Sequence, residues 1–220
     1  MPDSGCYIYS GDPSNRRWFR QTRVHQTLTL DGKDTAYAPK LLLWRPGENV
    51  DVLVVENASY PGLTHRRAVL FVDKQFFVLV DDAIGEATGD VDIHFQFAPG
   101  EATYDAQGLT ARTAFHDGWN VSVRNVMPEG ATLKEEEGQV SFVYTKKEPR
   151  PAFFYRVQKT TQEPGIRFVT LVVPYAGKPP EIRVTHISSP AAGGAKVDLE
   201  LSVNGTSKKI GYDLDGKKHM

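Results

Sequence analysis

Apolar and polar residues alternate with a period of two along most of the chain, which is the pattern of strands that bury one face. Turn residues separate these runs, as at Asp31-Gly32, Pro61-Gly62 and Asp117-Gly118. The predicted strands are residues 25–30, 41–44, 51–55, 68–72, 76–81, 91–97, 109–115, 120–126, 139–144, 152–160, 167–173, 182–187, 197–203 and 207–214. Short strands at this spacing predict an all-β fold, a large antiparallel β-sandwich of stacked sheets.

The clearest turn signal is Asn204-Gly205, between two of the predicted strands. Both residue types accept positive φ at low cost, so the pair predicts a two-residue hairpin. No stretch longer than two helical turns carries an apolar stripe with a 3.6-residue period, and no substantial helix is therefore expected.

We interpret residues 1–220 as one domain with a weak subdivision near residues 146–151, where charges and two prolines predict a loop. The small residues at 189–194 predict a second loop where the domain could be subdivided. Neither segment is long enough to be an obvious tether between domains. Because the chain opens on an Asp-x-Gly turn with no preceding strand to hold it, we expect it to be a fragment of a larger protein.

The overall charge excludes little on its own, since 26 Lys and Arg balance 27 Asp and Glu. A net charge of −1 gives no general reason to expect nucleic acid or an anionic membrane as partner. No apolar run reaches the ~18 residues of a membrane helix. The single cysteine, Cys6, permits no disulfide within the chain, and we expect it to be a small buried residue.

Candidate chemistry is concentrated in the first 30 residues, beginning with Asp3 and His25. Their separation allows a turn, a loop and a return, so the two side chains can face each other. A carboxylate oxygen and an imidazole nitrogen are half of a typical zinc shell. The spacing alone favours a structural alternative, in which Asp3 caps the turn at Ser4-Gly5 and His25 forms a hydrogen bond within the sheet.

A basic segment with an aromatic residue among its arginines is the second candidate. Its residues are Arg16, Arg17, Trp18, Arg20 and Arg23. Guanidinium groups match carboxylate and sulfate oxygens in pairs, and aromatic rings stack on sugars, so the segment predicts binding of an acidic polysaccharide. The alternative is a solvated charged loop that pairs with Asp12 and nearby acids. Binding of nucleic acid is disfavoured because no basic face accompanies the segment.

The other polar residues are predicted to have structural roles. Structural rather than catalytic roles are predicted for four further histidines, which are His65, His94, His116 and His186. Asp81-Asp82 is predicted to form a turn at the end of a strand, in preference to a metal pair. The charged residues 134–137 are predicted to be a solvated hairpin tip.

An ordered set of motifs in the opening residues points to a family. The set consists of the turn Asp3-Ser4-Gly5 with Tyr7 and Tyr9, the basic segment Arg16-Arg17-Trp18-Phe19-Arg20, and the stretch Val24-His25-Gln26-Thr27-Leu28. It resembles the heparinase II/III family of polysaccharide lyases, and most closely the heparinase III branch, which acts on heparan sulfate. Gln26 stands where many members have Asn, so alginate or another uronate polymer stays open as the substrate.

The resemblance implies a periplasmic bacterial lyase with an N-terminal (α/α) toroid and a C-terminal β-domain that forms one wall of the substrate cleft. Cleavage would proceed by β-elimination. The family's catalytic residues would all lie upstream of residue 1, so this chain alone is expected to be inactive.

By position, Asp3 and His25 match family ligands of a divalent metal, zinc or calcium, whose third ligand is an upstream histidine. With two ligands, the fragment is expected to bind metal weakly. Two alternatives from other classes stay open, a stand-alone β-sandwich that binds acidic carbohydrate and a purely structural domain.

Overall fold

The computed structural model describes residues 1–187 and 192–216, and nearly all of its regular structure is antiparallel β-sheet. Two short helices, α1 (Pro13–Arg20) and the 3₁₀ helix η1 (Thr22–Val24), precede the strands. The strands are β1 (Leu28–Leu30), β2 (Pro39–Arg45), β3 (Val50–Tyr60), β4 (Leu63–Val72), β5 (Phe76–Ile84), β6 (Gly89–Gln96), β7 (Ala102–Asp105), β8 (Thr110–Thr113), β9 (Trp119–Met127), β10 (Thr132–Glu136), β11 (Gln139–Val143), β12 (Lys146–Pro149), β13 (Ala152–Lys159), β14 (Gly165–Ala176), β15 (Ile182–Ile187), β16 (Lys196–Val203) and β17 (Thr206–Asp213). The predicted all-β class is confirmed.

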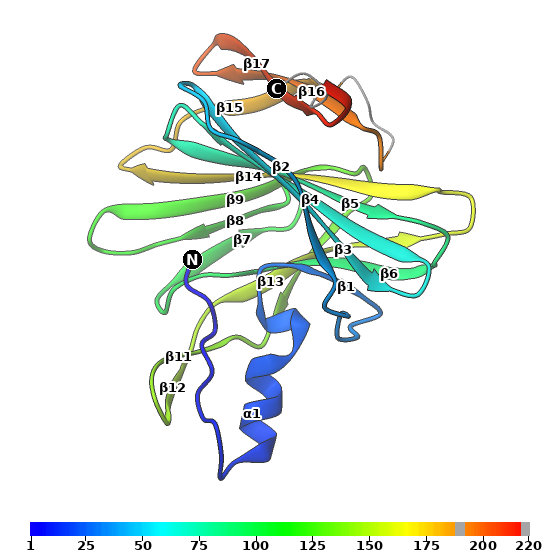
Figure 1. Cartoon of the computed structure of the whole chain (residues 1–220). Coiled ribbons are helices and arrows are strands. Elements are labelled where there is room, and N and C mark those ends of the chain that lie inside the picture. The colour runs from blue at the N-terminus through cyan, green and yellow to red at the C-terminus, as the bar shows by residue number, and fades with distance from the viewer. Residues whose placement is uncertain (188–191, 217–220) are drawn as a thin grey trace.

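The sheets are stacked in three layers (Figure 1). The middle layer is an eight-stranded sheet in the order β2-β3-β4-β5-β14-β9-β8-β7. A three-stranded sheet, β15-β16-β17, covers its upper face, and a four-stranded sheet, β1-β6-β13-β10, covers its lower face. The hairpin β11–β12 forms a separate two-stranded sheet, which projects below the stack together with α1.

Two apolar cores result from this stacking because the middle sheet buries both of its faces. On β14, Leu171 and Val173 belong to the upper core, whereas Ile166 and Phe168 belong to the lower core. Successive side chains of a strand point to opposite faces, so one strand serves both cores. The prediction of stacked sheets is therefore confirmed, with a third layer that the alternation did not reveal.

The paired acids Asp81 and Asp82 lie inside β5, so the prediction of a turn at a strand end is wrong. Both are fully buried. Asp81 accepts from Arg67 and pairs with His65, at 2.6 Å each, and Asp82 pairs with Arg167 at 2.7 Å. Burial would raise the pKa of Asp81, but the charge of Arg67 and the contact with His65 outweigh it and lower that pKa. Each carboxylate is thus neutralised by a partner in the sheet.

The hairpin β16–β17 turns at Asn204-Gly205, with φ of 49° and 85°, as predicted. Strands β7, β10 and β12 were not predicted. The hairpin tip expected at residues 134–137 is wrong, because β10 pairs with β13 there. The loop expected at 146–151 is wrong over β12, which pairs with β11. The segment at 189–194 lies partly outside the described residues.

Cys6 is exposed, so the expectation that it is buried is wrong. Within residues 1–187 and 192–216, the helices are too short and too polar to cross a membrane.

Candidate functional site

Arg16, Arg17, Trp18 and Arg20 lie on a short helix, α1, and Arg23 lies on η1, so the part of the alternative that predicted a loop is wrong. Asp12 caps the N-terminus of α1, since its Oδ1 accepts from the Asn15 amide at 3.1 Å. Pro13 follows at the first position, where its fixed φ suits a helix and its missing N–H costs nothing. Phe19 is buried and anchors the helix, while Arg17 and Arg20 remain exposed in its last turn. Local cap chemistry therefore explains how the arginines are presented.

Asp3 and His25 face each other, as the sequence permitted. Asp3 Oδ2 lies 2.6 Å from His25 Nδ1. The second oxygen, Oδ1, accepts from the Gly5 amide at 2.9 Å, so Asp3 also caps its own turn. Burial would raise the pKa of Asp3, but the Gly5 amide and His25 together lower it. The carboxylate is thus held ionised and aimed at the imidazole.

Arg150 fixes the backbone on both sides of Asp3. Its side chain is buried and donates to the Pro2 carbonyl at 2.7 Å and to Ser4 Oγ at 2.6 Å. Burial lowers the pKa of Arg150 to about 10, against an opposing effect of the Asp3 charge. No local pattern predicts this role, because an arginine next to Pro151 is expected to lie in a loop.

A second group of hydrogen bonds ties this turn to the segment that carries His25. Ser4 Oγ also donates to the Val24 carbonyl. Gln96, on β6, donates through Nε2 to the Arg23 carbonyl at 3.0 Å. Gln26 donates to the Pro2 carbonyl at 3.2 Å. The two halves of the Asp3–His25 pair are therefore positioned from both sides, and Gln96 is a further residue that the sequence did not single out.

The two ligand atoms of Asp3 and His25 are of types that zinc binds, but a zinc site needs at least three protein ligands. A carboxylate oxygen and an imidazole nitrogen suit zinc, whereas calcium prefers an all-oxygen shell. Two ligand atoms on a tetrahedral zinc are ~3.3 Å apart, so this hydrogen-bonded pair must open by roughly 0.7 Å. Among the described residues, no group of three or more His, Cys, Asp or Glu side chains is placed to hold a metal.

A cavity of about 740 Å³ opens beside α1. It is lined by Arg17, Arg20, Gln21, Thr22, His25, Thr27, Asp34, Thr35 and Tyr37. No hydrogen bond or ion pair joins the side chain of Arg17 or Arg20 to another described residue, and Tyr37 is 93% exposed. Two free guanidinium groups, an open aromatic ring and the imidazole of the Asp3–His25 pair therefore meet in one cavity.

The other predicted binding residues point elsewhere. Arg16 donates to the Tyr9 carbonyl. Arg23 lies 3.8 Å from Glu136 and sits 5.8 Å over the ring of Trp18. The Trp18 Nε1 atom is buried without a partner among the described residues. These three side chains contact neighbouring parts of the chain and do not line the cavity. Of the predicted sugar-binding residues, only Arg17 and Arg20 line it.

Both ring nitrogens of the buried residue His94 have a hydrogen-bond partner. Nδ1 lies 2.7 Å from Glu136 Oε1, and Nε2 lies 2.9 Å from Thr29 Oγ1. Glu136 also contacts Arg23, so a chain of polar contacts runs from the lower sheet to η1. Polar contacts thereby connect strands β1, β6 and β10 with η1, which the sequence pattern alone does not relate to one another.

Comparison with known proteins decides the family. The model of the family "Heparinase II/III-like, C-terminal" matches residues 1–185. The chain belongs to this family. It is 38% identical to a heparin-sulfate lyase of Pedobacter heparinus over 95% of its own length and 32% of that protein's, and 34% identical to a heparin-sulfate lyase of Bacteroides stercoris over 97% and 33%.

Solved structures agree with the family assignment. The heparan sulfate lyase HepC of Pedobacter heparinus superposes with a TM-score of 0.90 at 38% identity, covering 97% of this chain and 34% of that one. A heparinase III structure gives a TM-score of 0.91 at 34% identity, with the same coverage. The chain thus spans about a third of the length of the relatives it matches.

Proposed function

We propose that the chain is the C-terminal β-domain of a polysaccharide lyase that cleaves heparan sulfate or heparin, and that it forms one wall of the substrate cleft. The similarity to heparin-sulfate lyases over nearly the whole chain supports the reaction class. The observation that carries the site is that His25 belongs both to the pair with Asp3 and to the cavity with Arg17 and Arg20.

The reaction proposed is β-elimination at a uronate. A base removes the C5 proton, the electron pair forms the C4–C5 double bond, the C4–O bond breaks, and an acid protonates the leaving oxygen. The C5 proton becomes removable only when the charge of the uronate carboxylate is offset by cations or hydrogen-bond donors. Arg17 and Arg20 are free to hold carboxylate and sulfate groups of the polymer at the cavity.

The acid and base of this reaction are proposed to lie outside the chain, on an upstream (α/α) toroid and on an upstream histidine. The chain alone is accordingly proposed to be inactive. Asp3 and His25 would hold a divalent metal together with one more upstream histidine, and zinc suits these donors better than calcium. The metal would stiffen the loop behind the arginines. A periplasmic location is proposed on the family resemblance alone.

The test uses the whole protein, including the region upstream of residue 1. Its cleavage of heparan sulfate is followed by the ultraviolet absorbance of the unsaturated uronide. The variant Arg17→Gln/Arg20→Gln should raise KM by about tenfold or more, since each lost charge-assisted hydrogen bond contributes about 1.5–3 kcal/mol. The charge-matched control Lys196→Gln/Lys209→Gln should leave KM unchanged.

Two outcomes contradict the proposal. Absence of unsaturated product from heparan sulfate and heparin, with product from alginate or another uronate polymer, would assign a different substrate. An unchanged KM in the Arg17→Gln/Arg20→Gln variant would remove α1 from the substrate cleft.

The second candidate, a domain that binds acidic carbohydrate without help from the rest of the protein, is favoured by one observation. The cavity with Arg17 and Arg20 is built entirely from residues of this chain. Binding of heparan sulfate by the 220-residue chain, weakened by salt and lost in the same double variant, would support it. If the chain alone does not bind heparan sulfate but the whole protein cleaves it, the stand-alone binding function is rejected and the role as a cleft wall remains.

A further inference from the structure

A second basic cavity is lined by residues of β8, β9 and β14 and by the segment that leads into β15. The strand register builds it. Arg112 on β8 is the neighbour of Ser122 on β9, and Arg124 follows two residues later on the same face. Leu171 and Val173 of β14 continue these two rows and form the floor. Two arginines on adjacent strands therefore converge on one patch of the middle sheet.

The chain segment that leads into β15 closes the cavity, whose volume is about 430 Å³. This volume falls in the range of ligand pockets, about 300–1,000 Å³. The charged residues that line it are Arg112, Arg124, Lys178, Glu181 and Arg183. Four cations thus face a single carboxylate.

These positive charges are poorly compensated. Arg124 donates to the Ile182 carbonyl at 2.7 Å, and burial together with the charges of Arg112 and Arg183 lowers its pKa. Among the described residues, the side chain of Arg112 has no hydrogen-bond or ion-pair partner. Arg183 pairs with Glu181 at 2.5 Å, but both side chains are largely exposed, at 70% and 65%, where such a pair contributes little.

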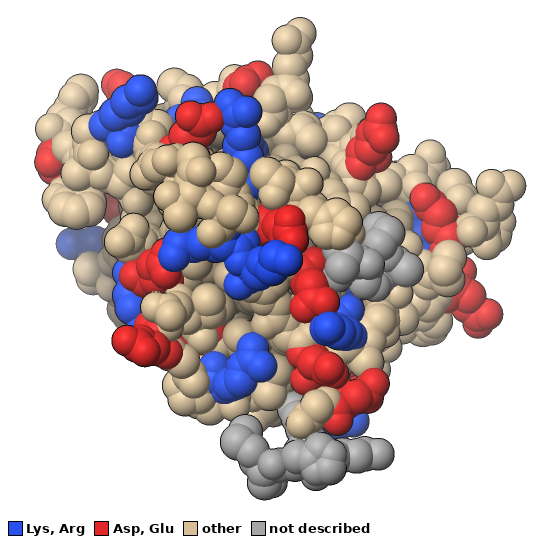
Figure 2. Space-filling model, turned by 90° about the horizontal axis from the view of Figure 1, so that it is seen from above, with Lys and Arg blue, Asp and Glu red and all other residues tan. Residues whose placement is uncertain are grey.

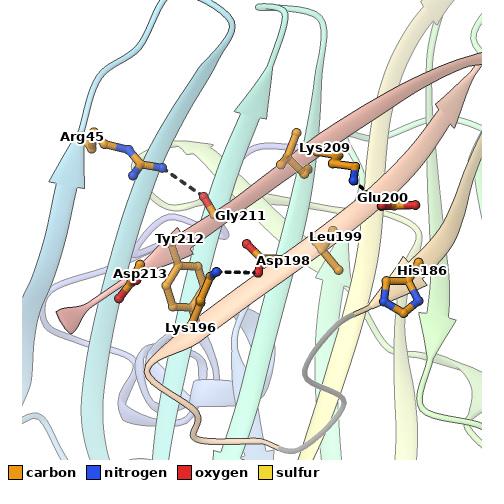
Figure 3. Close-up of a pocket in the computed structure, with 11 residues that line it drawn as sticks. Arg45, His186, Lys196, Asp198, Leu199, Glu200, Lys209, Gly211, Tyr212 and Asp213 are labelled. Carbon is orange, nitrogen blue, oxygen red and sulfur yellow. Dashed lines mark hydrogen bonds and ion pairs between the residues drawn. The ribbon is translucent and has the colours of Figure 1, made fainter. Parts of the chain in front are cut away.

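In the groove on the outer face of the upper sheet, the lysines are paired with acids (Figure 3). There Lys196 pairs with Asp198 and Lys209 with Glu200, at 3.0 Å each, and Arg45 donates to a backbone carbonyl. Figure 2 shows basic and acidic side chains interspersed over this surface. Lys196 and Lys209 on that face have carboxylate partners, whereas no ion pair joins Arg112 or Arg124 to a carboxylate of the described residues.

We infer that the cavity around Arg112, Arg124 and Arg183 is an anion site that takes sulfate groups, with those of an acidic polysaccharide as its ligand. Guanidinium groups bind such oxygens in pairs, and a bound anion relieves the repulsion among them. This cavity shares no lining residue with the cavity beside α1. The identity of the polymer rests on the proposed function, whereas binding of inorganic sulfate does not.

The experiment titrates the 220-residue chain with inorganic sulfate and, separately, with a heparan sulfate oligosaccharide, by calorimetry at low salt. The variant Arg112→Gln/Arg124→Gln/Arg183→Gln should lose about tenfold or more in affinity for both probes, as expected for the loss of even one charge-assisted hydrogen bond. The charge-matched control Arg45→Gln/Lys196→Gln/Lys209→Gln should keep the affinity of the wild-type chain for both.

Since Arg124 contacts the Ile182 carbonyl, the triple variant can lose its fold. The single variant Arg112→Gln then serves, because the Arg112 side chain is exposed and has no partner among the described residues to lose. Wild-type affinity for both probes in Arg112→Gln, or equal losses in the control, would overturn the inference. Binding of sulfate without the oligosaccharide would overturn its polysaccharide part.

Failure of the lyase proposal is recognised separately. In that case the whole protein releases no unsaturated product from heparan sulfate, while sulfate binding at Arg112 and Arg124 is still measured. A variant with Arg17→Gln/Arg20→Gln should keep wild-type affinity for inorganic sulfate at this site. Loss of sulfate binding in that variant would place the anion at α1 and overturn the inference.

Discussion

Replacing Arg150 by methionine should release the turn that carries Asp3 while leaving the stacked sheets folded. The change removes the bonds to the Pro2 carbonyl and to Ser4 Oγ, and methionine keeps most of the apolar stem. Both acceptors lie on the flanks of Asp3, so the perturbation falls on the backbone that aims its carboxylate at His25.

The magnitude follows from two opposing effects. Each hydrogen bond from a charged donor contributes about 1.5–3 kcal/mol, so the two bonds together contribute about 3–6 kcal/mol. Removing the guanidinium also removes the cost of burying it, which is reflected in its pKa of about 10 and in the Nε atom that lacks a partner among the described residues. We expect a net local destabilisation of about 2–3 kcal/mol.

Amide hydrogen exchange is the assay, because two amides report directly on this segment. The Ser141 amide donates to the Ser4 carbonyl and the Thr145 amide donates to the Tyr7 carbonyl. In Arg150→Met, their protection should fall by roughly 30- to 150-fold, while protection in the core strands changes less. Arg156→Met is the matched control, since Arg156 pairs with Asp92 and does not touch the opening turn. Wild-type protection at Ser141 and Thr145 in Arg150→Met, or the same loss in the control, would refute the reasoning.

Three further predictions concern the middle sheet and the lower core. Arg167→Met leaves Asp82 buried without its cation, and the free energy of unfolding in urea should fall by about 3–5 kcal/mol; a loss below about 1 kcal/mol contradicts this. Asp81 has a lowered pKa in the folded state, so its stabilisation is complete above the unfolded pKa of about 3.9 and is lost as pH falls through the folded value. Unfolding measured from pH 6 to pH 2 should therefore depend less on pH in Asp81→Asn, and an unchanged slope argues against it. Tyr155→Phe deletes a buried hydroxyl that faces two backbone carbonyls, and thermal unfolding should show a loss of about 1–2 kcal/mol; wild-type stability would mean that the hydroxyl contributes nothing.

The sequence predicted the strands that alternate cleanly and missed those that do not. β12 is polar throughout, because as half of an isolated hairpin it buries no face of its own. The helix α1 was missed although Asp12-Pro13 is a recognisable cap, since its apolar stripe is too short to show a period. The third layer could not be read from the alternation, which reports that a face is buried and not what covers it.

The candidate ligands could be predicted from the sequence, whereas the residues that hold them in position could be identified only in the structure. Asp3 and His25 were found because their types and order are informative. Arg150 and Gln96 were not, because their roles depend on contacts across 146 and 73 positions of the chain, respectively. Likewise, only the fold separates Arg17 and Arg20, which are open to solvent in a cavity, from arginines that support the helix.

The metal content of the whole protein tests the central claim most directly. The wild-type protein and the variants Asp3→Ala/His25→Ala and His186→Ala are purified in the same way, and their bound zinc is measured by elemental analysis. We predict about one zinc ion per chain in the wild type and in His186→Ala, and a large loss in the double variant. Full retention of metal by Asp3→Ala/His25→Ala would contradict the assignment of this pair as half of a metal site.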